Sequence, residues 1–135
     1  MVKIDAYISV RKENRIENLK GDLFKIASKK RESESDFGEI YITTIYPGKV
    51  KGWKYHKKMT SKLFVIRGSV RFTFCLRDDM KERYYFELSE DEFESIEIKP
   101  GVWMAFECIS STEAYILNFA DIPHDDSESI NKTYG

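Results

Sequence analysis

Apolar and polar side chains alternate with a period of two in the middle of the chain. Residues 62–79, KLFVIRGSVRFTFCLRDD, contain two apolar runs that meet at Gly68-Ser69. In the second run, Val70, Phe72 and Phe74 alternate with the residues between them. This spacing puts alternate side chains on opposite faces, so it predicts two β-strands joined by a tight turn.

Further runs rich in β-branched and aromatic residues lie before and after this pair. Turn residues such as Pro47-Gly48, the acidic stretch 89–92 and Pro100-Gly101 separate them. About eight to ten short strands, with turn signals every 8 to 12 residues, predict an antiparallel sandwich or barrel. The expected strands include EIYITTIY, RYYFEL, FESIEIK, VWMAFECI and, as the last clear one, EAYILNFA.

The start and the end of the chain are less regular. We expect short strands near residues 6–10 and 22–26 and a solvated loop over 29–36. A chain of 135 residues is too short for two independent cores. We therefore expect one domain over 1–135, with N-terminal strands and a loop in 1–36, a barrel core in 38–122 and a C-terminal tail in 123–135.

Composition excludes several classes of protein. Cys75 and Cys108 lie far apart inside apolar runs, which is typical of small buried thiols and not of a disulfide framework or a zinc site. No run approaches the roughly 18 apolar residues of a membrane span, and the start lacks a signal-peptide profile. A net charge of −1 argues against nucleic-acid binding. We expect a cytoplasmic protein.

Charge is concentrated in two segments of opposite sign. Residues 49–67 contain seven Lys or Arg and no acid, whereas residues 78–97 contain nine acids. Each run has a simple explanation as a solvated face. The basic run also contains Trp53 and Tyr55, and aromatic rings beside ammonium groups suit a ligand with a flat ring and phosphates. On a strand, Lys54, His56 and Lys58 would share one face.

Three segments together resemble the cupin-fold epimerases and isomerases of sugar nucleotides. They are KGWKYHKKMTSKLFVIRGSVRF, IKPGVWMAFECIS and AYILNFADIPHDDSE, and the likeness covers about Gly38 to Asp126. The most similar patterns are those of dTDP-4-dehydrorhamnose 3,5-epimerase and the sugar 3,4-ketoisomerases. The resemblance implies an all-β jelly-roll domain (a double-stranded β-helix), a homodimer and no cofactor. It also implies proton transfer next to the keto group of a dTDP-linked 4-keto-6-deoxy sugar, in surface polysaccharide synthesis.

The resemblance also assigns roles to individual positions. Lys54 falls where the epimerases have their catalytic His, and His56 falls at the second His of the ketoisomerases. Tyr41 lies roughly where the ketoisomerases place a proton-handling Tyr, and the segment NFADIPHDD contains no Tyr to match the epimerases' proton donor. The candidate catalytic residues are therefore His56, Lys54 and Tyr41. The candidate substrate-binding residues are Lys51, Trp53, Lys58, Arg67 and Met104.

The chemistry of these positions leaves alternatives open. Proton transfer next to a ketone needs a base and a cation or donor that holds the enolate oxygen. His56 is equally well explained as a polar residue that lines the barrel or lies on its surface, and Tyr41 as part of the sheet packing. His124, in IPHDDSE, is expected in an exposed turn.

A metal centre is not expected. The chain has two His residues, so a site with three imidazoles from one chain is excluded. The basic segment around His56 contains no Glu, and Met104 takes the place of a further His. Several ammonium groups around one imidazole are electrostatically unfavourable for a divalent cation.

Three functional hypotheses follow. The first is a cofactor-independent epimerase or ketoisomerase of a dTDP-sugar. The second is a catalytically inactive module of the same fold that binds a nucleotide sugar or another anionic ligand. The third is a structural protein whose basic face docks an acidic surface, a contact that salt would weaken.

Overall fold

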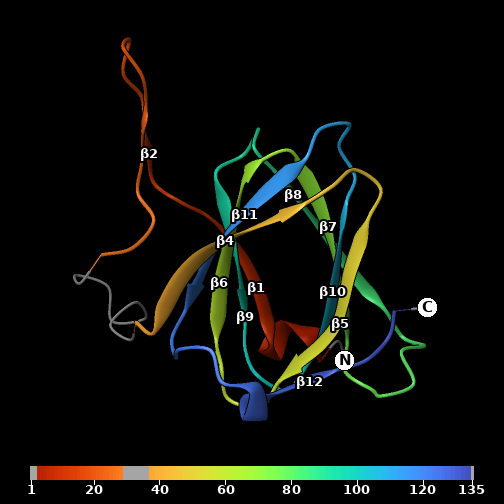
Figure 1. Cartoon of the computed structure of the whole chain (residues 1–135). Coiled ribbons are helices and arrows are strands. Elements are labelled where there is room, and N and C mark those ends of the chain that lie inside the picture. Colours follow the sequence, from red (N-terminus) through yellow and green to blue (C-terminus); the bar gives the residue numbers. More distant parts are fainter. Residues whose placement is uncertain (1–2, 29–36, 135) are drawn as a thin grey trace.

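The computed structural model describes residues 3–28 and 37–134 and consists of two β-sheets packed face to face (Figure 1). Both sheets have five strands, and all pairings are antiparallel. The first sheet has the order β1 (Ile8–Lys12), β9 (Glu94–Ile98), β6 (Ser61–Arg67), β11 (Ala114–Ala120), β4 (Glu39–Ile45). The second has the order β12 (Ser129–Asn131), β5 (Val50–His56), β10 (Trp103–Cys108), β7 (Ser69–Cys75), β8 (Tyr84–Ser89).

The alternation of side chains places the main core between the sheets. Val70, Phe72 and Phe74 of β7 are fully buried there, as the period of two predicts. Along β11, Ala114, Ile116, Asn118 and Ala120 are buried and the residues between them are half-buried. The all-β jelly-roll architecture expected from the sequence is confirmed, and no helix in the described residues is long and apolar enough to cross a membrane.

The N-terminal segment differs in detail from the expected one. The first strand is β1 at Ile8–Lys12, after the 3-10 turn η1 (Ile4–Ala6). A separate two-stranded hairpin, β2 (Arg15–Ile16) and β3 (Leu23–Phe24), then projects from the body of the barrel (Figure 1). The expected solvated loop over 29–36 lies outside the described residues.

The C-terminal segment corrects a prediction. The strand 114–120 is not the last one, because the 3-10 turn η3 (Asp126–Glu128) leads into β12. Strand β12 pairs with β5, with Ser129 opposite His56 and Asn131 opposite Lys54. Within the segment expected to be a tail, residues 129–131 thus form an edge strand of the second sheet, next to the basic segment.

Candidate functional site

A cavity of about 500 Å³ opens between the two sheets. This volume is within the range of small-molecule sites, about 300–1,000 Å³. Strands β4, β5, β6, β10 and β11 form most of its wall, and the C-terminal segment closes one side. The lining residues used below are Tyr41, Thr43, Lys51, Lys54, His56, Met104, Asn118 and His124.

One wall of the cavity carries positive charge. Lys51 and Lys54 both lie on β5, on either side of Gly52-Trp53. The Lys51 ammonium donates to the carbonyl oxygen of Thr44 on β4, with an Nζ to O distance of 2.7 Å. Lys54 is half-buried and lies in register with Met104, so the charged residue has an apolar neighbour. Two ammonium groups at the edge of a partly apolar cavity attract an anionic ligand.

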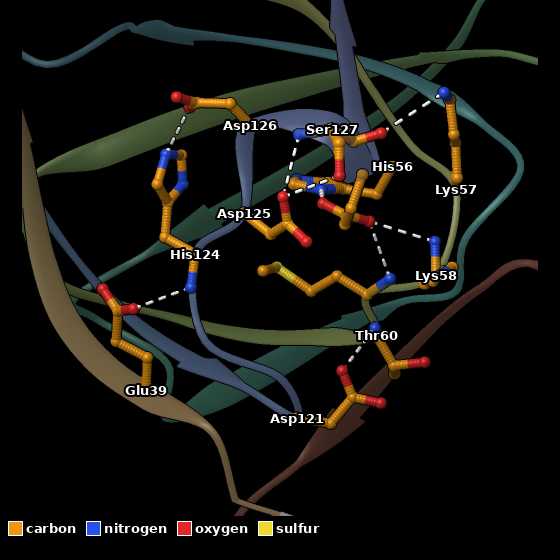
Figure 2. Close-up of polar contacts among 12 residues, drawn as sticks. Glu39, His56, Lys57, Lys58, Thr60, Asp121, His124, Asp125, Asp126 and Ser127 are labelled. Carbon is orange, nitrogen blue, oxygen red and sulfur yellow. Dashed lines mark hydrogen bonds and ion pairs between the residues drawn. The ribbon is translucent and has the colours of Figure 1, made fainter.

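A histidine–carboxylate pair lies at the end of β5. The Nδ1 atom of His56 is 2.6 Å from Oε1 of Glu128, whose side chain is only 3% exposed (Figure 2). The other oxygen of Glu128 accepts hydrogen bonds from the backbone N–H groups of Lys58 and Met59, at 3.0 and 2.9 Å. The carboxylate is therefore held by three donors from the 56–59 segment.

These contacts favour the ionised form of Glu128. Its burial by itself would raise the pKa of the carboxyl group, but the hydrogen bonds from His56, Lys58 and Met59 together lower that pKa below its ordinary value. The ionised carboxylate makes Nδ1 of His56 the nitrogen that carries a proton. Its Nε2 atom is then the nitrogen left to exchange a proton with a ligand.

The wall formed by the first sheet is polar and uncharged near its centre. Tyr41 of β4, Asn118 of β11 and Leu63 of β6 lie in register across three neighbouring strands. Partial burial raises the pKa of the Tyr41 hydroxyl, and the negative charge of Glu39 raises it further. Tyr41 therefore keeps its proton at neutral pH and can donate a hydrogen bond.

Apart from Trp53, five of the eight candidate residues line this cavity. These are Tyr41, Lys51, Lys54, His56 and Met104. Lys58 and Arg67 are not among the residues that line it. Arg67 lies at the other end of β6, with its guanidinium 5.4 Å from the centre of the Tyr115 ring. At Lys58, the strand has already ended, and only its backbone N–H reaches the site, through Glu128.

Trp53 requires a correction of its expected role. It is among the residues that line the cavity, but it is only 2% exposed and packs in a second core cluster with Cys75, Trp103 and Ala105. Tyr134 lies 5.2 Å from the Trp53 ring centre, and the Arg83 guanidinium lies over the ring. The ring is thus already covered by residues of its own chain and does not offer a free face to a ligand.

Sequence reasoning missed the buried acid of the site. Glu128 contacts a histidine 72 residues earlier in the chain, and the isolated segment DSESI shows only exposed-looking polar residues around one Ile. His124 was expected in an exposed turn, and its side chain is 63% exposed, but it also lines the cavity. Its Nε2 atom is 2.7 Å from Oδ1 of Asp126, and its backbone N–H donates to Glu39 (Figure 2).

Metal ligands do not gather at this site. Within residues 3–28 and 37–134, no three His, Cys, Asp or Glu side chains are placed to hold one ion together.

Comparison with known structures identifies the fold. A dTDP-sugar isomerase from Desulfovibrio desulfuricans G20 is 27% identical and superposes with a TM-score of 0.83, over 93% of this chain and 83% of that one. A sugar 3,4-ketoisomerase from Thermoanaerobacterium thermosaccharolyticum, solved with TDP, is 24% identical with a TM-score of 0.79, over 92% and 87% of the two chains. A dTDP-6-deoxy-D-glucose 3,5-epimerase from Legionella pneumophila is 15% identical with a TM-score of 0.82, over 98% and 76%.

The sequence comparisons are more limited. No curated protein sequence matches the chain significantly. The family model of the polysaccharide biosynthesis C-terminal domain, by contrast, matches residues 17–130. The resemblance to dTDP-sugar epimerases and ketoisomerases is confirmed by the structures above, and the chain belongs to the polysaccharide biosynthesis C-terminal domain family.

Proposed function

We propose that this protein isomerises or epimerises a dTDP-linked 4-keto-6-deoxy sugar, by proton transfer next to the keto group, in polysaccharide biosynthesis. The observation that carries the proposal is the His56–Glu128 pair, whose histidine lines the same cavity as Lys51 and Lys54. The family match and the fold shared with a dTDP-sugar isomerase support this substrate class.

The residues of the cavity have the chemistry that this reaction needs. The Nε2 atom of His56 removes the proton from the carbon next to the carbonyl, and Glu128 stabilises the imidazolium that forms. Lys54 and the protonated Tyr41 donate to the enolate oxygen, where negative charge develops. In an isomerisation, Tyr41 gives its proton to the enolate oxygen and takes one back from the neighbouring hydroxyl group. His56 then returns its proton to the former keto carbon, so that keto and hydroxyl groups exchange places.

The same cavity has charge for the nucleotide part of the substrate. The diphosphate of a nucleotide sugar carries two negative charges, and the exposed Lys51 lines the cavity together with the catalytic candidates. Lys51 and Lys54 attract the diphosphate, and Met104 contributes an apolar surface opposite Lys54. Nucleotide binding should therefore weaken as salt concentration rises.

The test is hydrogen exchange in deuterated water with freshly prepared dTDP-4-keto-6-deoxyglucose. We expect the protein to incorporate deuterium at a carbon next to the keto group, as measured by mass spectrometry. His56→Asn should reduce this rate by about 10²- to 10⁴-fold while dTDP still binds. Lys57→Ala is the matched control, because the exposed Lys57 ammonium donates to the carbonyl of Ser127 and, among the described residues, is not part of the cavity lining. Absence of exchange with plausible 4-keto sugars would contradict the enzymatic proposal.

An inactive binding module is the second candidate function. It is favoured by one observation, namely that the cavity wall has Met104 beside Lys54 where a second imidazole would strengthen proton transfer. Titration calorimetry with dTDP separates the two candidates. Binding without exchange supports the module, whereas exchange supports the enzyme.

We also propose that two copies associate, and that the protein acts in the cytoplasm, where its buried free thiols stay reduced. Strand β4 is an edge strand with Ile40 and Ile42 exposed, and the projecting hairpin exposes Leu19 and Leu23. Light scattering should give twice the 15.9 kDa mass of one chain. Ile42→Lys should lower that mass, and a monomeric wild type would contradict the proposal.

A further inference from the structure

A buried amide lies in the middle of the cavity wall. Asn118 of β11 is 9% exposed and has its side chain on the same face as the core residue Ile116. It lines the cavity between Tyr41 of β4 and Leu63 of β6, with which it lies in register. It therefore faces any sugar that His56 and Tyr41 contact.

The amide group of Asn118 has a defined orientation. Its Nδ2 atom donates to the carbonyl of Ile116 at 3.0 Å, to the hydroxyl of Thr43 at 3.2 Å and to the carbonyl of Tyr41 at 3.4 Å. If oxygen and nitrogen were exchanged, the oxygen would face two carbonyl oxygens, which cannot donate. Oxygen Oδ1 is therefore the atom left to the cavity, and no described residue donates a hydrogen bond to it.

We propose that Oδ1 of Asn118 accepts a hydrogen bond from a hydroxyl group of the substrate's hexose and so determines which sugars the site accepts. This inference rests on the proposed function, because it names a specificity residue for that substrate. Thr43 completes the contact, since its oxygen accepts from Asn118 and its own hydroxyl proton is left to donate. One acceptor and one donor side by side match a hydroxyl group, which both donates and accepts.

The chemistry of the amide separates this role from proton transfer. An amide neither gains nor loses a proton near neutral pH, so Asn118 cannot return a proton to a sugar carbon. A carbonyl oxygen cannot donate to Oδ1, and a sugar that lacks the hydroxyl gives no hydrogen bond to this acceptor of a residue that is 9% exposed. Asn118 thus favours sugars with a hydroxyl at one position and rejects sugars with a keto group or no oxygen there.

The test uses dTDP, dTDP-6-deoxyglucose and the three analogues of that sugar that lack the 2-, 3- or 4-hydroxyl group. We expect calorimetry to show one analogue binding the wild-type protein about 10-fold or more weakly than the parent. In Asn118→Ala, the parent and this analogue should bind equally, and binding of dTDP itself should change little. Asn131→Ala is the control, because this second cavity-lining amide is exposed and should leave the ratio of the two affinities unchanged.

A second measurement needs no variant. The side-chain N–H signals of Asn118 in a nitrogen–proton spectrum should shift with the parent sugar and shift less with the discriminated analogue. If dTDP-6-deoxyglucose binds but every analogue binds equally well, the Asn118 inference is overturned and the proposed function stands. If neither dTDP nor its sugars bind, the proposed function fails, and the inference fails with it.

Discussion

Glu128 shows how one residue can organise a site. It is a carboxylate with 3% exposure that accepts hydrogen bonds from the His56 ring and from two successive backbone N–H groups. The same side chain holds the imidazole in place and ends β5 in a defined turn. Loss of this side chain would leave buried donors without partners, which is the expensive outcome for a buried hydrogen-bond network.

We expect Glu128→Gln to lower the free energy of unfolding by about 1 to 3 kcal/mol at pH 7. The wild-type pKa lies below the ordinary 4.5, so the ionised carboxylate stabilises the folded state above that pH. This contribution is lost as pH falls below 4.5 toward the folded-state pKa, and the Gln variant lacks it. Urea denaturation between pH 3 and 7 measures both effects.

The control for this prediction is Glu92→Gln. Glu92 is exposed in the acidic turn, and its substitution should change stability by less than about 0.5 kcal/mol. If the free energy of unfolding falls equally between pH 7 and pH 3 in Glu128→Gln and Glu92→Gln, the network around His56 contributes nothing to pH-dependent stability.

Other site residues were accessible to reasoning from the sequence because they lie close together in the chain. Lys54 and His56 lie two residues apart on one strand, so the period of two already puts them on one face. Lys51 reaches that face because the register between β5 and β10 shifts between Gly52 and Lys54. The prediction that Trp53 stacks on a ligand does not fit its place in the structure, because the residue is buried. The period of two gives it the opposite face from Lys54, and that face is covered by Tyr134 from the C-terminal segment.

At the scale of elements, β5 and β10 approach each other unusually closely at Gly52. The register shifts between Met104 and Ala105 there, and Gly52 has a φ of +141°. A Cβ atom at residue 52 would lie 2.6 Å from the Ala105 Cβ and 2.9 Å from the Met104 carbonyl oxygen. A glycine is therefore required for the strand that carries Lys51, Lys54 and His56.

Gly52→Ala should lower the free energy of unfolding by about 2 to 4 kcal/mol, because the added methyl group meets backbone atoms that cannot move independently. Gly48→Ala is the matched comparison. Its φ is +75°, but a Cβ there meets nothing within 4 Å, so only the cost of about 1 kcal/mol for the left-handed conformation applies. Thermal and urea denaturation of both variants measure the difference. Equal losses of the free energy of unfolding would show that the close contact of residue 52 with β10 does not destabilise the Gly52→Ala variant.

Strand β12 is an element that the sequence analysis did not predict. It has only three residues, and its neighbours in the sequence are polar. Strand β12 is held by its backbone pairing with β5 and by the contact of Glu128, just before it, with His56. Short edge strands of this kind depend on tertiary contacts more than on propensity.

For the whole molecule, the two packed sheets bury both thiols. Cys75 has no exposed surface and Cys108 is 1% exposed, and burial raises the pKa of the Cys75 thiol. Because the thiolate is the reactive form, both groups should be inert in the folded protein.

A thiol reagent such as dithionitrobenzoate should therefore label no cysteine of the native protein within minutes at pH 8, and two after denaturation in guanidinium. Reaction of one thiol in the native state would show that local opening exposes an interior strand, β7 or β10. Mass spectrometry after proteolysis would then identify which cysteine reacted.

The sequence by itself determined the fold class and the basic segment of the site. Alternating apolar residues, turn residues at regular spacing and the motifs around 51–56 and 100–104 are local signals, so they can be read before the chain is folded. The count of two histidines was likewise available from the sequence alone.

Only the tertiary structure decided which side chains meet. The pairing of β12 with β5 brings Glu128 to His56, and the register of β4, β11 and β6 brings Asn118 between Tyr41 and Leu63. These partners are separated by many residues, and sheet register depends on the packing of the whole core, not on the local pattern of any one strand. The contact of Glu128 with His56 and the place of Asn118 in the cavity wall therefore became visible only in the folded chain.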